Sequence, residues 1–199
     1  LARKHKLYII EDACQGIAAE INERRVGSFG EAGAFSLHPL KNINVWSDGG
    51  IITTNSKKLY ETLKLLRNHG MKNRDEYVSF GYNSRLDTVA AAVGLEVVRD
   101  LDWITETRIK HAALYDQGLQ ELTPHITLPP RRPSVRYVYH LYIIEAQRRD
   151  ELLEHLKSKG IEAKVHYPIP LHLQECSRHL GYKKGDFPIA EAQARSIIT

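Results

Sequence analysis

The sequence has few cysteines, a single methionine and no long apolar run. Of its 199 residues two are cysteine, Cys14 and Cys176, and one is methionine. Two cysteines this far apart provide neither a disulfide framework nor a zinc site, so a reducing cytoplasm is the expected compartment. Even the longest apolar runs are short, for example residues 7–10, and they are far below the length that spans a bilayer. A disulfide scaffold and a membrane-spanning protein are therefore excluded.

The net charge and the first residues of the chain indicate which ligands to expect and how the chain begins. Lys and Arg exceed Asp and Glu by 28 − 24 = 4, which favours an anionic small molecule but is too small to indicate nucleic acid. The chain begins with Leu1 and its one methionine is Met71. We therefore expect Leu1 to be internal to a longer protein, or exposed by processing. No signal peptide is visible, because no long apolar segment follows the cations at residues 3–6.

Apolar periodicity and capping residues predict an α/β organisation in the first part of the chain. We expect the end of a helix at 1–6, strands at 6–10 and 51–54, and a helix capped by Asn55 or Ser56. A long helical stretch, capped by Asp87, should run from Thr88 to about Leu122. Gly94 weakens it locally, so this stretch is predicted as two helices or one bent helix.

The composition changes near Pro124, where we place a domain boundary between residues 1–123 and 124–199. The proline-rich stretch 129–133 reads as an extended connector. After it we expect a strand at 139–144, a helix at 150–158, and a strand at 161–165 that completes a β-α-β unit. A last helix should open at Pro188 and run to the chain end. Both domains are thus predicted to be α/β.

Three side chains follow predicted strands and could serve one cofactor. Asp12 comes after the first strand, and Ser36 and Lys41 lie on one later loop. Pyridoxal phosphate needs a carboxylate at its pyridinium nitrogen, a lysine at its aldehyde carbon and donors around its phosphate. Each residue also has a simpler interpretation: the aspartate as a turn or cap, the lysine as a solvated surface charge, the serine as part of a turn.

Longer motifs strengthen the cofactor hypothesis. The phrases EDACQ, RRVGSFGEAGAFSLHPLKN, DGGIITTN, LRNHG and YNSRLD occur in this order from residue 11 onward, and VHYPIPLHLQ follows at 165–174. In these motifs the chain resembles the DegT/DnrJ/EryC1/StrS sugar aminotransferases, a branch of the fold-type I pyridoxal phosphate enzymes. The resemblance implies part of the large mixed-sheet α/β domain in residues 1–123 and most of the small α/β C-terminal domain in residues 124–199.

The resemblance also implies a role for each matching residue. Asp12 would pair with the pyridine nitrogen, Gln15 with the phenolic oxygen, and Ser36 with the phosphate. Lys41 would bind the cofactor as a Schiff base and then move the proton in catalysis. Asn83 would reach the phosphate of a neighbouring subunit's cofactor, so the family pattern implies a homodimer with a shared active site.

The implied reaction is transamination of a keto sugar. Glutamate is the expected amino donor, and a nucleotide-linked, dTDP-type 3-keto-deoxysugar is the expected acceptor. His166 and Tyr167 would lie near the sugar; the alternative is that this segment is a proline-stiffened connector with a packed aromatic. Dehydrases of the family carry histidine where this chain has Lys41, which disfavours dehydration. We interpret His38 as a structural neighbour of the site.

Several alternatives stay open from the sequence alone. Family chains are about twice this length, so the 199-residue chain is predicted to be inactive and poorly folded by itself, because phosphate donors and the ring-stacking aromatic would be missing. The chain could instead be a catalytically inactive family fragment or scaffold subunit. A cyclitol ketone is an alternative acceptor. Nucleic-acid binding through the connector arginines is disfavoured, and no histidine pair has metal-ligand spacing.

Overall fold

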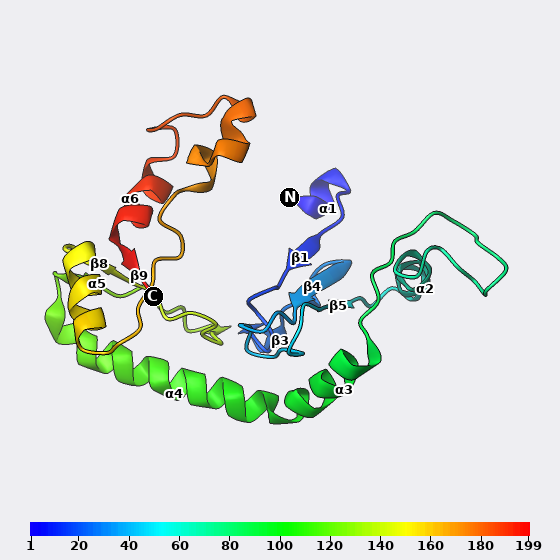
Figure 1. Cartoon of the computed structure of the whole chain (residues 1–199), viewed down its shortest axis with the longest axis horizontal. Helices are drawn as coiled ribbons and strands as arrows, with labels where there is room; N and C mark the ends of the chain where they lie inside the picture. Colours follow the sequence, from blue (N-terminus) through cyan, green and yellow to red (C-terminus); the bar gives the residue numbers. More distant parts are fainter. The chain divides into compact units, whose positions relative to one another are not determined.

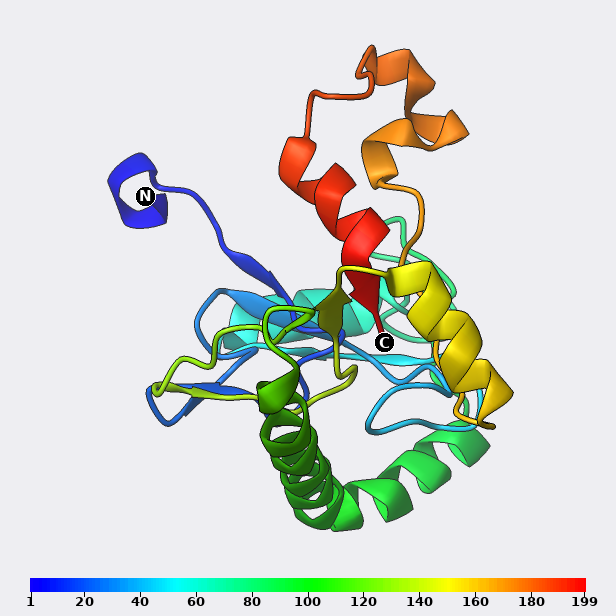
Figure 2. The same ribbon diagram turned by 90° about the vertical axis from the view of Figure 1, so that its left-hand side faces the viewer.

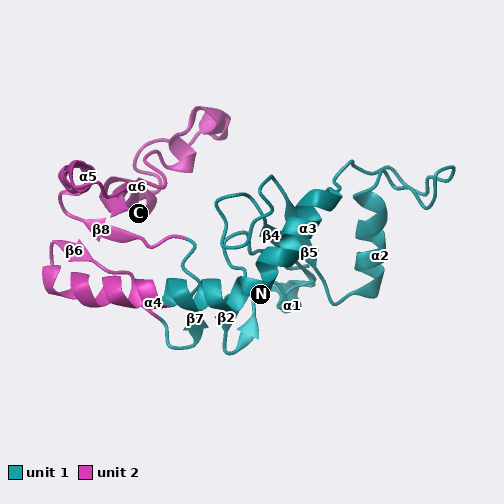
Figure 3. Ribbon diagram, turned by 60° about the horizontal axis from the view of Figure 1, so that its bottom comes forward, with its two compact units in different colours: residues 1–109, 132–140 teal, residues 110–131, 141–199 magenta.

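The computed structural model describes residues 1–199, which divide into two compact units (Figure 3). Unit 1 consists of residues 1–109 and 132–140, and unit 2 of residues 110–131 and 141–199. Each unit contains its own β-sheet and helices. No helix in either unit is both long enough and apolar enough to cross a membrane.

Unit 1 contains two small sheets (Figure 1). In the first, of order β1-β4-β5, β4 is parallel to β1 and antiparallel to β5. The second, of order β3-β2-β7, is antiparallel throughout. The elements of unit 1 are α1 (Ala2–His5), β1 (Ile10–Asp12), β2 (Glu20–Ile21), β3 (Arg24–Arg25), β4 (Ala32–Ser36), β5 (Gly50–Thr53), α2 (Lys57–Leu66), α3 (Thr88–Val97), the 3-10 turn η1 (Val98–Asp100), the first part of α4 (Leu101–Leu119) and β7 (Val135–Arg136).

The first strand begins later than the sequence predicts. Helix α1 is present, but Lys6 ends it in a left-handed conformation, with φ of 52°. The predicted strand at 6–10 is therefore wrong over most of its length: β1 starts at Ile10, which is the first residue to face β4, at Ala32. A strand exists only where a neighbour completes its hydrogen-bond ladder, and β4 provides that neighbour from Ala32 onward.

Two helix N-termini form where the sequence predicts them. Ser56 caps α2 by accepting a hydrogen bond from the Leu59 backbone N–H at 3.2 Å. Asp87 caps α3 by accepting from the Ala90 N–H at 2.8 Å. Each side chain satisfies a backbone donor that the helix itself leaves unpaired.

The long helical stretch is interrupted, but not at the glycine. The chain passes from α3 to α4 through η1 at residues 98–100, where the helix changes direction (Figure 2). Gly94 lies inside α3, and a β-carbon there would approach the Val45 side chain to 3.0 Å. This glycine therefore allows close packing of α3 against Val45. The interruption predicted at Gly94 lies instead at residues 98–100.

The core of unit 1 lies directly under the loop that carries Lys41. Leu37, Ile43 and Val45 are each 2% exposed and pack with Ala90 of α3. Two of them flank the loop, Leu37 on one side and Ile43 on the other. Burial of apolar side chains on both sides of an exposed turn fixes where that turn leaves the core.

Unit 2 is built on an antiparallel sheet of order β6-β8-β9. Its elements are the rest of α4, η2 (Gln120–Leu122), β6 (Ile126–Thr127), β8 (Ile144–Ala146), α5 (Arg149–Ser158), η3 (Leu171–Leu173), η4 (Glu175–Leu180), α6 (Pro188–Ser196) and β9 (Ile197–Ile198). Helices α5 and α6 match the predicted helices at 150–158 and from Pro188, although the chain continues from α6 into β9.

The predicted β-α-β unit is wrong. Residues 161–165 form no named strand; Lys164 exchanges two backbone hydrogen bonds with Thr199, at 3.0 and 2.8 Å. The place beside β8 is taken by β9 from the chain end. The predicted strand at 139–144 is also interrupted, because Tyr139 adopts a positive φ of 46° that breaks an extended backbone; only Ile144 of that range belongs to β8.

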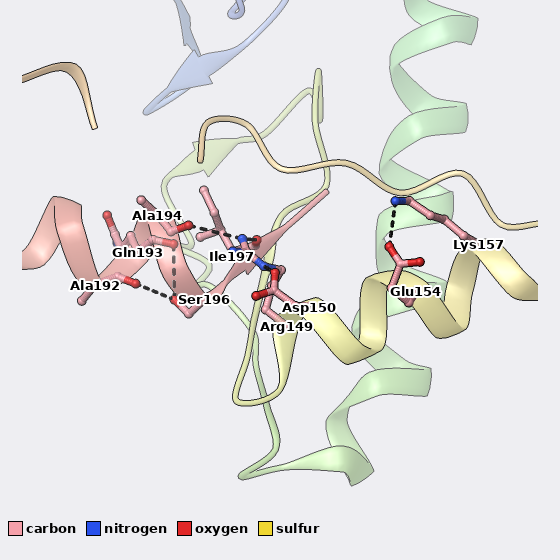
Figure 4. A network of polar contacts seen from close by, with 9 residues as sticks. All are labelled: Arg149, Asp150, Glu154, Lys157, Ala192, Gln193, Ala194, Ser196 and Ile197. Carbon is pink, nitrogen blue, oxygen red and sulfur yellow. Dashed lines mark hydrogen bonds and ion pairs between the residues drawn. The ribbon is translucent and has the colours of Figure 1, made fainter. Parts of the chain in front are cut away.

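A partly buried arginine holds three elements of unit 2 together (Figure 4). Arg149 begins α5, and its side chain is 11% exposed. It donates to the carbonyl oxygens of Ala194 in α6 at 3.2 Å and Ile197 in β9 at 3.0 Å, and pairs with Asp150. These carbonyls lie at a helix C-terminus, where a cation is favourable.

Candidate functional site

Asp12 lies at the carboxyl end of β1 with an exposed side chain. Its Oδ1 accepts a hydrogen bond from the Cys14 backbone N–H at 3.1 Å. Contacts with the Cys14 thiol and N–H, together with the positive charge of Lys41, hold the pKa of Asp12 below its usual value. The Asp12 carboxylate is therefore ionised at neutral pH, and the positive charge of Lys41 stabilises this ionised form.

Cys14 is a part of the site that the sequence reasoning missed. Its Sγ lies 3.7 Å from the Ala34 carbonyl oxygen of β4. The contact with the Asp12 carboxylate and partial burial raise the pKa of the thiol, although Lys41 opposes this. At neutral pH Cys14 is thus a neutral thiol that supports the carboxylate. Its place two residues after Asp12, at a turn, was the available signal.

Ser36 and Lys41 are connected by a compact turn after β4. The Ser36 hydroxyl oxygen accepts from the His38 N–H at 3.3 Å. The His38 carbonyl accepts from the Lys41 N–H at 2.8 Å, and its ring Nδ1 accepts from the Leu40 N–H at 3.2 Å. His38 thus folds the turn that carries the half-buried Lys41.

Asn42 ties the same loop to the core of unit 1. The side chain is 6% exposed, and its Nδ2 donates to the Val138 carbonyl at 2.9 Å. Its Oδ1 is buried and has no hydrogen-bond partner. A buried acceptor without a donor is costly. The sequence reasoning did not select Asn42, although it directly follows Lys41.

The remaining predicted residues are not joined to the Asp12–Lys41 pair by any hydrogen bond or ion pair. Gln15 is exposed on the turn after β1. Asn83 is exposed as well, and its Oδ1 accepts from the Arg85 Nε at 3.1 Å. It also forms an isolated antiparallel bridge with Asn68. The structure therefore places Asn83 on a separate segment of unit 1.

His166 and Tyr167 lie in unit 2. The Nδ1 atom of His166 is 3.2 Å from the Thr199 hydroxyl, and the two aromatic rings meet edge to face at 5.4 Å between centroids. Tyr167 is 71% exposed. The proline-stiffened segment thus holds the histidine against the chain end and leaves the tyrosine free for contact. No group of three His, Cys, Asp or Glu side chains in residues 1–199 could hold a metal ion.

The residues around Asp12 fit pyridoxal phosphate in their chemistry. An ionised, exposed carboxylate suits a protonated ring nitrogen, and a half-buried amine in its electrostatic field suits the aldehyde carbon. The Ser36 hydroxyl, at the end of β4 and the start of the same loop, adds a hydrogen-bond donor.

Comparison with known proteins establishes the family. The model of the DegT/DnrJ/EryC1/StrS aminotransferase family matches residues 1–199, and the chain belongs to this family. A Geobacillus stearothermophilus "pleiotropic regulatory protein" is 42% identical over 100% of this chain and 54% of its own length. The Streptomyces venezuelae dTDP-3-amino-3,4,6-trideoxy-alpha-D-glucose transaminase is 39% identical over 100% of this chain and 52% of its own length.

Solved structures confirm the predicted fold. S. venezuelae DesV in complex with a ketimine intermediate superposes with a TM-score of 0.94 at 38% identity, over 99% of this chain and 53% of that one. A family aminotransferase from Brucella abortus superposes with a TM-score of 0.90 at 34% identity, over 99% and 52%. The fold is therefore that of the sugar aminotransferases, and the chain spans about half the length of the relatives it matches.

Proposed function

We propose that the protein is a pyridoxal phosphate-dependent sugar aminotransferase. The observation that carries this proposal is that Asp12 ends β1 while the loop with Ser36 and Lys41 follows β4, the parallel neighbour of β1, and that the charge of Lys41 lowers the pKa of Asp12. Such strand ends are where α/β sheets bind ligands. The family, and relatives named as sugar transaminases, support the same conclusion.

In this proposal each residue of the chain has one task. When bound, pyridoxal phosphate supplies the electron sink for amino-group transfer. Asp12 holds the proton on the ring nitrogen, and Ser36 donates to the phosphate. Gln15 orients the ring through its phenolic oxygen. Lys41 Nζ binds the aldehyde carbon and, once released, carries the proton to and from the substrate carbon.

We further propose that the acceptor is a nucleotide-linked 3-keto-deoxysugar of the dTDP type, with glutamate as amino donor. The support is that relatives at 39% and 37% identity are named as dTDP-3-amino sugar transaminases. His166 and Tyr167 are the proposed sugar contacts, since Tyr167 leaves a polar aromatic side chain open to solvent. A cyclitol ketone is the competing acceptor.

A homodimer completes the proposal. Residues 70–82 form an arm that is braced internally, with the Val78 N–H donating to the Gly70 carbonyl at 3.0 Å. The arm exposes Tyr77, Phe80 and Tyr82 by 62, 101 and 74%. Exposed aromatic groups on a braced arm are typical of contact surfaces. Asn83 follows this arm, and we propose that it reaches the cofactor phosphate of the second subunit.

The test is the visible absorbance of the purified longer protein that contains residues 1–199, mixed with pyridoxal phosphate; this longer protein is used in every assay below. We expect a visible absorbance band that borohydride abolishes, and the reduced cofactor should then be found attached to Lys41. The band should be absent in Lys41→Ala. Lys57→Ala, at the exposed start of α2, is the matched control and should keep the band. Turnover by Lys41→Ala would refute the proposal. No band at excess cofactor would instead favour a non-catalytic partner subunit.

The acceptor is tested separately from the cofactor. The protein in its pyridoxamine form is mixed with dTDP-linked 3-keto sugars, other keto-sugar nucleotides and a cyclitol ketone. We expect the absorbance of the aldehyde form to return fastest with the dTDP-linked 3-keto sugar. A faster return with the cyclitol ketone would refute the nucleotide-sugar assignment and leave aminotransferase activity intact.

A further inference from the structure

Glu11 is the middle residue of β1, and three backbone N–H groups surround its carboxylate. Its Oε2 accepts from Gly27 at 2.7 Å, and its Oε1 accepts from Phe29 at 2.6 Å and Gly30 at 2.8 Å. Burial alone would raise the pKa of Glu11, but these donors outweigh it and hold the pKa below its usual value. The loop at 27–30 therefore closes around an ionised side chain.

The loop has little freedom to move away from Glu11. The Thr53 hydroxyl of β5 donates to the Gly27 carbonyl at 2.7 Å. A β-carbon on Gly33 of β4 would come within 2.4 Å of the Gly27 Cα, and one on Gly30 within 2.4 Å of the Ile9 carbonyl oxygen. Backbone approaches this close leave room for glycine only. The loop thus has one position against β1, β4 and β5.

This anchoring acts directly on the strand that carries Asp12. β1 has 3 residues, and Glu11 is the residue before Asp12 in it. Neighbouring side chains on a strand leave it on opposite sides. Glu11 therefore enters the loop on one side, while Asp12 presents its carboxylate on the other. Fixing Glu11 fixes the backbone from which Asp12 projects.

We propose that Glu11 is a positioning residue, which holds Asp12 where it can contact the ring nitrogen of pyridoxal phosphate. This inference rests on the proposed function. It assigns to Glu11 no contact with cofactor or substrate, and it predicts that changes at Glu11 act through Asp12.

The test measures the dissociation constant of pyridoxal phosphate by absorbance titration of the purified protein carrying Glu11→Gln. Glu31→Gln is the matched control, because Glu31 accepts only one backbone N–H, that of Ile9, and is exposed. Thr53→Val loosens the same loop from its other side and leaves Glu11 unchanged. This second variant keeps the test decisive if Glu11→Gln does not fold.

Groups that orient a ligand-binding residue contribute about 10–100-fold to affinity or activity in metal sites, and we expect Glu11→Gln to raise the dissociation constant within this range. Thr53→Val should raise it less, and Glu31→Gln by under about twofold. In the presence of Asp12→Asn, Glu11→Gln should add no further loss. The pH midpoint of the bound cofactor's absorbance should shift in the same direction in Glu11→Gln and Asp12→Asn.

Two results would overturn the positioning role. One is an unchanged dissociation constant in both Glu11→Gln and Thr53→Val. The other is a loss in the double variant equal to the two separate losses added together, which would mean that Glu11 acts independently of Asp12. If the unsubstituted protein binds no pyridoxal phosphate, the proposed function itself fails, and this outcome is seen before any variant is compared.

Discussion

Truncation of Leu37 to alanine tests whether the core of unit 1 holds the lysine loop. Leu37 is 2% exposed and packs with Ile43, Val45 and Ala90. The change removes three buried carbon atoms, worth about 2.4 kcal/mol at about 0.8 kcal/mol each. The cavity left behind adds to this, and buried Leu→Ala changes cost about 2.7–5 kcal/mol. Such a loss is a large share of a typical stability of about 5–15 kcal/mol.

Urea unfolding followed by circular dichroism measures the change. Leu40→Ala is the matched control, because Leu40 lies on the same loop and is 75% exposed. It should change the free energy of unfolding by less than about 0.5 kcal/mol. We expect Leu37→Ala to weaken retention of pyridoxal phosphate as well, since the loop would lose its anchor. Equal stability losses in Leu37→Ala and Leu40→Ala would refute the reasoning.

Two further predictions concern polar contacts in unit 2. Arg149→Met should destabilise the protein by about 1.5–3 kcal/mol in urea unfolding, because two carbonyls lose a charged donor; Arg148→Met, at an exposed ion pair, should change little, and equal losses would contradict the network in Figure 4. Burial alone would raise the pKa of Asp116, but hydrogen bonds from Arg131 and Tyr142 lower it below its usual value near 3.8. The stability that Asp116 contributes is therefore present above pH 3.8 and is lost as the pH falls below that value. Asp116→Asn should therefore flatten the loss of unfolding free energy as the pH falls below about 4, and an unchanged slope would argue against it. Burial and Asp116 raise the pKa of Tyr142, so the same variant should lower that pKa in an ultraviolet titration.

Local signals in the sequence predicted the helices better than the strands. Ser56 and Asp87 cap α2 and α3 as expected, because a cap depends on donors within three residues. The strand expected at 161–165 is absent, because β9, at residues 197–198, takes the place beside β8. Such a choice of partner is decided by distant parts of the chain, and no local pattern records it.

The same distinction applies to the candidate site. Asp12 and Lys41 could be selected from the sequence, because each follows a strand and carries the required chemistry. The hydrogen bonds of Glu11 could not be predicted, since its three donors lie 16 to 19 residues further along the chain. Asn42 was also missed, because its burial depends on the Val138 carbonyl, 96 residues away. Contacts between residues this far apart in the sequence depend on the three-dimensional fold.

The sheet of unit 1 leaves both of its outer strands without a further neighbour. β1 and β5 are the edges, and Ile10, Ile51 and Ile52 are 65, 45 and 53% exposed. Unpaired backbone groups beside branched apolar side chains act as a template for another strand. Within residues 1–199, β1 and β5 are therefore the strands beside which a further strand can pair with this sheet.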